Sequence, residues 1–142
     1  MTSYADASFV ASLYVPDSNS AAALRKITSA QFPVLLADFG ELEFINAISL
    51  CLFRKELHPS RADAARRAFR DDVENGILSI LPLPEGALPH ARRIAMQRTP
   101  LLGTRSIDVL HVAVAITVKA EIFFTFDRKQ SKLAVAEGLH VV

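Results

Sequence analysis

Four acidic residues stand in separate segments of the chain where their carboxylates could meet. Asp6 and Asp127 each follow a run of strand-like residues, whereas Glu43 and Asp108 lie in the first turns of segments with helical periodicity. The carboxyl ends of parallel strands emerge at one edge of a sheet, where such folds bind ligands. A group of like charges is costly unless a cation neutralises it, and hard oxygen ligands suit Mg²⁺ or Mn²⁺. One interpretation of these four acids is therefore a divalent-metal site.

Each acid also has an ordinary structural explanation. An Asp that follows a strand can cap the next helix, because its side chain accepts hydrogen bonds from free backbone N–H groups. Glu43 can be a favourable anion in the first turn of a helix, and Asp108 can cap its own helix or pair with Arg105. Spacing alone leaves the metal site and these capping roles open.

The segments that must position the acids alternate between short apolar runs and longer runs of helical period, which is the pattern of βαβ units. We expect strands at about 2–6, 33–37, 77–81, 122–126 and 139–142. We expect helices at about 8–27 with a break near 16–17, and at 41–56, 60–76, 84–99, 104–119 and 128–137. The predicted fold class is α/β, a three-layer α/β/α sandwich with a mostly parallel sheet of about five strands.

Several details of these helices are expected from single residues. The apolar residues that recur at helical spacing in 41–56, and so predict its core face, are Leu42, Ile45, Ile48, Leu52 and Phe53. Ser60 is the expected N-cap of the basic helix, and Gly76 suits the position just after its end. Pro100 should end the helix 84–99, and Thr104 or Ser106 should cap the next.

Length and composition bound the class of protein. The chain has 142 residues, is 51% hydrophobic, and carries sixteen Lys and Arg against fifteen Asp and Glu, a net charge of +1. This predicts a single domain over residues 1–142 and excludes an intrinsically disordered chain.

The longest apolar run, 109–118, is too short to cross a membrane, and no secretory signal pattern begins the chain, so we expect no membrane association. Cys51 alone allows no internal disulfide, which fits a cytoplasmic protein, and is most simply a core residue.

Basic residues are unevenly distributed along the chain. They outnumber acidic residues between positions 54 and 70, and a second group precedes Asp108. The cluster at 61–70 is either a solvated helix face with ion pairs or an RNA-binding surface, because Arg pairs with phosphate through a planar fork. Arg105 and Arg128 flank site acids and are the residues expected to bind substrate phosphate.

Four short blocks surround the acids. They are Asp-Ala-Ser at 6–8, Glu-Phe-Ile-Asn-Ala-Ile at 43–48, Asp-Val-Leu-His-Val-Ala at 108–113, and Thr-Phe-Asp at 125–127 with Gly-Leu at 138–139. In this order and spacing the sequence resembles the PIN-domain ribonucleases, in particular the VapC-type toxins of prokaryotic toxin–antitoxin pairs. The resemblance spans essentially the whole chain. It departs from the family at Ala7, where many members carry a hydroxyl residue, so any contact there must come from Ser8 or water.

The resemblance implies a Mg²⁺- or Mn²⁺-dependent endoribonuclease, the toxin of a type II toxin–antitoxin system, in which a metal-activated water cleaves RNA. It implies that the catalytic residues and metal ligands are the same four acids, Asp6, Glu43, Asp108 and Asp127. Residues that would orient these carboxylates or water are Ser8, Asn46 and Thr125. Glu41 replaces Glu43 if the register of the second block is different.

The resemblance also implies partners, namely an RNA substrate, a cognate antitoxin and a second copy in a homodimer. In the family the helices around the first long hairpin commonly form these interfaces, so Phe44, Leu50 and Phe53 are either partly interfacial or core residues. Asn46 can equally face solvent. His111 is expected to be a hydrogen-bonded packing residue rather than a ligand or base.

Two further function classes remain as alternatives. A catalytically silent PIN-like module would bind RNA or protein without turnover. A flavodoxin-like nucleotide or phosphate-acceptor domain fits the alternation of elements, but no glycine-rich phosphate loop follows the first strand.

Overall fold

The computed structural model describes residues 1–142. Its strands are β1 (Ser3–Ala5), β2 (Val34–Ala37), β3 (Leu78–Leu81), β4 (Ile122–Phe124) and β5 (His140–Val141). Its helices are α1 (Ala7–Tyr14), α2 (Ser20–Thr28), α3 (Asp38–Phe53), α4 (Pro59–Glu74), α5 (Ala87–Leu102), α6 (Ser106–Thr117) and α7 (Arg128–Ala136). None of these helices combines the length and the apolar character needed to cross a membrane.

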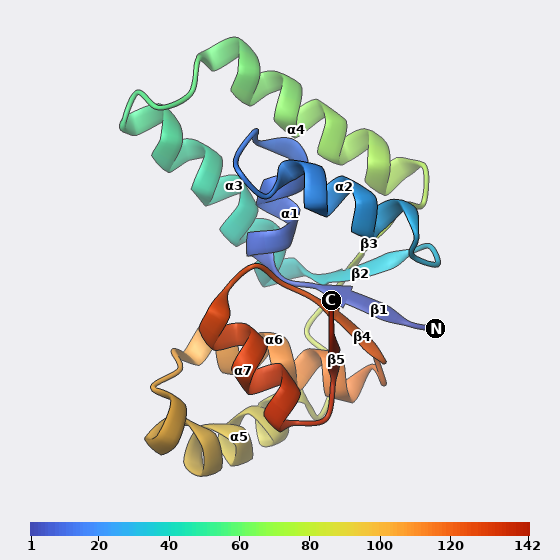
Figure 1. Cartoon of the computed structure of the whole chain (residues 1–142), viewed down its shortest axis with the longest axis vertical. Helices are drawn as coiled ribbons and strands as arrows, with labels where there is room; N and C mark the ends of the chain where they lie inside the picture. The colour runs from blue at the N-terminus through green and yellow to red at the C-terminus, as the bar shows by residue number, and fades with distance from the viewer.

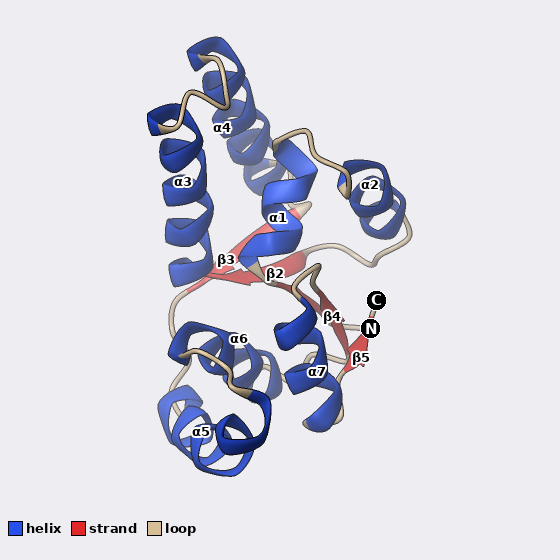
Figure 2. Ribbon diagram, turned by 60° about the vertical axis from the view of Figure 1, so that its left-hand side comes forward, coloured by secondary structure: helices blue, strands red, loops and turns tan.

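The strands form one five-stranded parallel sheet in the order β3-β2-β1-β4-β5. Helices α1 to α4 cover one face of this sheet and α5 to α7 cover the other, as Figures 1 and 2 show. The predicted three-layer α/β/α sandwich with about five parallel strands is therefore confirmed.

Alternation along the central strands divides the core into two clusters, because successive strand residues point to opposite faces. Tyr4 and Phe123 pack with α5, α6 and α7, whereas Ala5 and Phe124 pack with α1 to α4. All four are buried. The apolar run that begins at Ile122 is thus covered on both faces, as expected for a central parallel strand.

The strand order defines where a ligand can bind. The chain passes outward from β1 to β2 and β3, and then returns to place β4 on the other side of β1. Ligands in open parallel sheets bind at the carboxyl ends of the strands where this reversal occurs. Ala5 pairs with Phe124 at the end of β1, and the next backbone N–H, that of Asp6, donates to the Phe124 carbonyl at 3.1 Å. The residues after β1 and β4 are therefore neighbours at the reversal point.

The predicted core face of α3 was largely wrong. Of the residues expected inside, Ile48 is fully buried, but Leu42 is 65% exposed, Phe53 is 84% exposed and Ile45 is also exposed. The face that packs on the sheet instead carries Gly40, Phe44 and Ile48. Apolar residues surround almost the whole helix, so their spacing did not identify the buried side. The helix also begins at Asp38 and ends at Phe53, three residues earlier at each end than expected.

Three predicted helix ends also need correction. His58, not Ser60, caps α4, and its Nδ1 accepts from the Ser60 N–H at 3.2 Å. Helix α5 passes through Pro100 and ends before Gly103, because a proline in the last turn removes only one hydrogen bond and Gly103 adopts the left-handed conformation that closes the helix. Arg105 occupies the cap position of α6, where Thr104 or Ser106 was expected.

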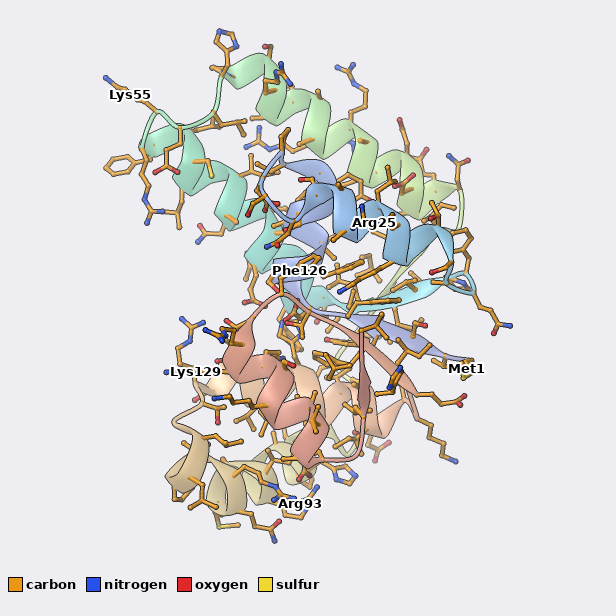
Figure 3. The ribbon with its side chains drawn as sticks, viewed as in Figure 1. Met1, Arg25, Lys55, Arg93, Phe126 and Lys129 are labelled. Atoms are coloured by element: carbon orange, nitrogen blue, oxygen red, sulfur yellow. The ribbon has the colours of Figure 1, made fainter.

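An ion-pair cluster joins α5 to the residue that follows α7. The Glu137 side chain, only 4% exposed, accepts from Arg93 at 2.7 Å and from Arg98 at 2.8 Å. Both arginines lie on α5, and Arg93 is labelled at the base of Figure 3. Burial alone would raise the pKa of Glu137, but the hydrogen bonds from the two arginines outweigh it and lower the pKa below its ordinary value of 4.5. The charged Glu137 carboxylate therefore holds α5 against the end of α7 through two ion pairs.

We expect Glu137→Gln to lower the free energy of unfolding at pH 7 by about 1 kcal/mol, a value reduced because both arginines are more than a third exposed. The folded-state pKa is lowered, so this stabilisation is present above the unfolded pKa and disappears as the pH falls through the folded value. Denaturant unfolding at pH 7 and pH 3 measures the difference. Glu74→Gln, at an exposed acid, is the control, and a loss as large at pH 3 as at pH 7 would contradict the assignment.

Candidate active site

Asp6 is the first residue after β1, at the reversal point of the sheet, and its side chain is almost fully enclosed. The residue is 4% exposed. Its Oδ1 accepts from the Phe9 N–H at 3.0 Å, which caps α1, and from the Ser8 hydroxyl at 2.6 Å. Its Oδ2 accepts from the Thr125 hydroxyl at 2.5 Å. Burial raises the pKa of the Asp6 carboxyl above its ordinary value, although the hydrogen bonds from Ser8 and Thr125 oppose that shift.

Ser8 and Thr125 connect the ends of β1 and β4 through this carboxylate. Besides donating to Asp6, the Ser8 hydroxyl accepts from the Phe126 N–H at 3.0 Å. The Thr125 hydroxyl accepts from the Asp127 N–H at 3.0 Å. Asp6 and Asp127 are therefore linked through one threonine side chain, which holds the two acids of neighbouring strands in a fixed relation.

Asp127 begins α7 as its N-cap and accepts from the Gln130 N–H at 2.9 Å through Oδ1. The loop before it is anchored by Phe126, labelled near the centre of Figure 3 where the chain passes from β4 to α7. The Phe126 ring stacks on Phe9 at 5.5 Å, and the Lys26 ammonium lies 4.9 Å from its centroid. Aromatic packing thus fixes the backbone that carries Asp127.

Asp108 lies in the first turn of α6 and is 7% exposed. Its Oδ2 accepts from the Arg105 backbone N–H at 3.3 Å and faces the Arg105 guanidinium at 3.4 Å. The capping role and the pairing with Arg105 that the sequence left open both occur.

Glu43 reaches from α3 toward α6, where its Oε1 lies 2.5 Å from His111 Nε2. Glu41 instead lines a depression between α3 and α4 together with Arg66 and Arg70. Asn46 is exposed and makes no side-chain hydrogen bond. The structure thus brings Ser8 and Thr125, but not Asn46, into contact with an acid, and it turns Glu43, not Glu41, toward His111.

A scan against family models finds a match to the PIN domain over residues 3–136. This match covers nearly the whole chain. The chain belongs to the PIN-domain family. The four acids and the residues directly around them lie within the match, and the Gly-Leu pair at 138–139 follows its end. The recognition made from sequence is confirmed. No curated protein matches the chain.

Solved structures with the same fold support this assignment of the PIN domain. VapC20 from Mycobacterium tuberculosis, described as a sarcin–ricin-loop-cleaving toxin, is 17% identical with a TM-score of 0.70 over 97% of this chain and 96% of that chain. FitAcB from Neisseria gonorrhoeae is 16% identical with a TM-score of 0.67, covering 97% and 94%. PAE2754 from Pyrobaculum aerophilum is 20% identical with a TM-score of 0.65, covering 99% and 90%. At these identities the likeness concerns the fold.

The acids of this PIN domain fit a divalent ion in the chemistry of their donor atoms. Glu43 Oε2, Asp108 Oδ1 and Asp127 Oδ2 have no hydrogen-bond partner in the protein. Asp6 accepts three hydrogen bonds, and an ionised carboxylate offers about four lone-pair sites, so one position remains. No three acidic, histidine or cysteine side chains lie close enough, as they stand, to hold a metal ion. Oxygen donors are therefore present, but they are not gathered around a common point.

Basic side chains border the PIN-domain acids. Arg128 and Lys132 line an open depression of about 340 Å³ together with Thr125 and Asp127. The Arg105 side chain is 76% exposed beside Asp108. Both arginines predicted to contact phosphate are therefore adjacent to acids.

One polar residue at this end of the PIN domain was not identified from the sequence. Tyr4, buried in β1, bonds through its hydroxyl to His111 Nδ1 at 2.7 Å. A tyrosine inside an apolar strand is the available signal, because a buried phenol usually finds a hydrogen-bond partner. The partner itself lies 107 residues away and could not be named from the chain alone.

The raised pKa of Asp6 predicts that its negative charge destabilises the fold at neutral pH. We expect Asp6→Asn to raise the thermal midpoint at pH 7 by a few degrees, because the amide keeps the hydrogen bonds at Oδ1 and removes the desolvated charge. Asp127→Asn is the matched control, since Asn caps helices about as well as Asp and this side chain is less buried. Differential scanning calorimetry measures both, and a lower midpoint for Asp6→Asn would contradict the expectation.

Proposed function

We propose that this PIN domain is a Mg²⁺- or Mn²⁺-dependent endoribonuclease and the toxin of a type II toxin–antitoxin system. The observation that carries the proposal is the buried Asp6 carboxylate at the sheet reversal point, tied through Thr125 to Asp127. Membership of the PIN-domain family and the fold shared with VapC20, a toxin that cleaves the sarcin–ricin loop, support it. We propose that the protein acts on this RNA in the cytoplasm.

The proposed metal ligands are the acids of the four blocks, Asp6, Glu43, Asp108 and Asp127. When bound, a divalent ion lowers the pKa of a water molecule and stabilises the charge that develops on a phosphate. Ser8 and Thr125 hold the Asp6 carboxylate in one orientation by donating to its two oxygens. Outer partners of this kind commonly change metal affinity or activity by 10–100-fold, and we assign this supporting role to the two hydroxyls.

Arg105 and Arg128 would contact the phosphates of the RNA. Arg105 is mostly exposed beside Asp108, and Arg128 lines the depression that contains Asp127. Guanidinium groups pair with phosphate oxygens through two parallel hydrogen bonds. The acids would thus act at one phosphate while the arginines hold the strand.

The direct test is cleavage of single-stranded or structured RNA by the purified full chain. We expect cleavage with Mg²⁺ or Mn²⁺, none with EDTA, and a loss of at least about 100-fold in Asp6→Asn and in Asp108→Asn, since each removes a charged ligand. Asp71→Asn, at an exposed acid of α4, serves as the control.

A catalytically silent module is the alternative, and one observation favours it. Each of the four acids already has a protein partner, and no three ligating side chains are assembled around a common point. This alternative predicts RNA binding with no metal-dependent turnover. Undiminished RNA cleavage by Asp6→Asn would reject the assignment of the catalytic residues. RNA binding by the wild type without any cleavage would reject the enzymatic function.

We further propose that the partners are a cognate antitoxin and a second copy of this chain. Helix α3 presents apolar side chains to solvent at Leu42, Ile45, Leu50 and Phe53. Phe44, for which the sequence left both roles open, is buried with Phe69 and Tyr14 and belongs to the core. Exposed apolar faces of this kind are typical of protein interfaces.

Phe53→Ser and Leu42→Ser test whether the exposed apolar face of α3 forms a homodimer. Both side chains are exposed, so the substitutions should leave the helical content of the chain unchanged in circular dichroism while shifting the protein from dimer to monomer. Sedimentation velocity over a concentration series measures the shift. Leu24→Ser, at an exposed apolar residue of α2, is the control. A wild-type chain that sediments as a monomer at every concentration would exclude the homodimer.

A further inference from the structure

His111 joins Glu43 to the central strand through two hydrogen bonds. The imidazole is 1% exposed on α6. Its Nε2 lies 2.5 Å from Glu43 Oε1 on α3, and its Nδ1 lies 2.7 Å from the Tyr4 hydroxyl on β1. Both ring nitrogens are therefore engaged, each with a residue from a different element.

The ring is held on its faces and edges as well as at its nitrogens. Phe39 packs against it with centroids 4.7 Å apart, and Tyr4 meets it edge-on at 5.8 Å. A Cβ at Gly40 would lie 3.1 Å from His111 Cε1 and 2.5 Å from Leu36 Cδ1, so the glycine allows α3 to approach the imidazole. The position of Glu43 relative to α6 therefore depends on this ring.

The chemistry of the three groups fixes the direction of the hydrogen bonds. An ionised carboxylate only accepts, so the contact with Glu43 requires a proton on His111 Nε2. A tyrosine hydroxyl can donate to Nδ1 while Nε2 carries the proton.

We propose that His111 is a positioning residue, and that with Tyr4 behind it His111 holds the Glu43 carboxylate by Oε1 and leaves Oε2 for a divalent ion. This inference rests on the proposed function, because it gives Glu43 the role of a ligand. Outer hydrogen bonds that orient a metal ligand contribute 10–100-fold to affinity in other proteins. A packing role alone would require only the shape of the ring.

Two substitutions of His111 separate these roles. The amide nitrogen of glutamine reaches the place of Nε2 and can still donate to Glu43, whereas the shorter asparagine reaches only the place of Nδ1. We expect His111→Asn to weaken Mn²⁺ binding about 10–100-fold and His111→Gln to restore most of the affinity. Tyr4→Phe should weaken Mn²⁺ binding to a smaller degree. Tyr14→Phe, which removes a hydroxyl bonded to Asp72 on the other side of the sheet, should have no effect.

Isothermal titration of the purified full chain with Mn²⁺ measures these affinities, and thermal melting verifies that each variant is folded. If the wild type binds Mn²⁺ and cleaves RNA, equal Mn²⁺ affinities of His111→Asn and His111→Gln would overturn the positioning role alone. A wild type that neither binds Mn²⁺ nor cleaves RNA would overturn the proposed function and this role together.

A second readout needs no metal and concerns the proton itself. Long-range ¹H–¹⁵N NMR spectra of the histidine side chains report which ring nitrogen of His111 carries hydrogen. We expect a protonated Nε2 in the wild type. An unprotonated Nε2 would overturn the proposal, because His111 could then not donate to Glu43.

Discussion

The cost of keeping a carboxylate charged inside the protein is the constraint on which the site depends. Asp6 stands where β1 and β4 end side by side, and burial raises its pKa. Ser8, Thr125 and the start of α1 all donate to it, so the two central strands and a helix converge on one side chain. These donors offset only part of the desolvation. A bound cation would offset the rest, which connects the packing of the sheet to the proposed chemistry.

Capping and ligand roles coincide in this structure. Asp6 and Asp127 are N-caps of helices, and Asp108 accepts a hydrogen bond from the backbone N–H of Arg105, the residue before its own helix. Each of these hydrogen bonds fixes a carboxylate relative to a rigid helix end, while some acceptor positions remain available. A residue that stabilises local structure can therefore also be held in the orientation that ion binding needs. The sequence presented the two roles as alternatives, and the geometry allows both.

The order of strands and helices followed from apolar periodicity, and the four blocks indicated the family. Other features depend on contacts that periodicity does not encode. The sheet order decides that Asp6 and Thr125 are neighbours although they are separated by 119 residues. The buried face of α3 carries Gly40, Phe44 and Ile48, and Gly40 lies close to Leu36 and His111. Apolar residues surround almost the whole helix, so their spacing does not reveal these contacts. The Tyr4 hydroxyl has a partner on α6 that no local pattern predicts.

The central claim is that Asp6, Glu43, Asp108 and Asp127 share a divalent cation at the carboxyl ends of β1 and β4. A crystal structure of the wild-type chain with Mn²⁺, with data recorded near the manganese absorption edge, tests it most directly. The account predicts an anomalous peak within ligand distance of Asp6 and of at least two of the other three acids. No peak at this position at saturating Mn²⁺, with each acid still bonded to its protein partner, would contradict the account.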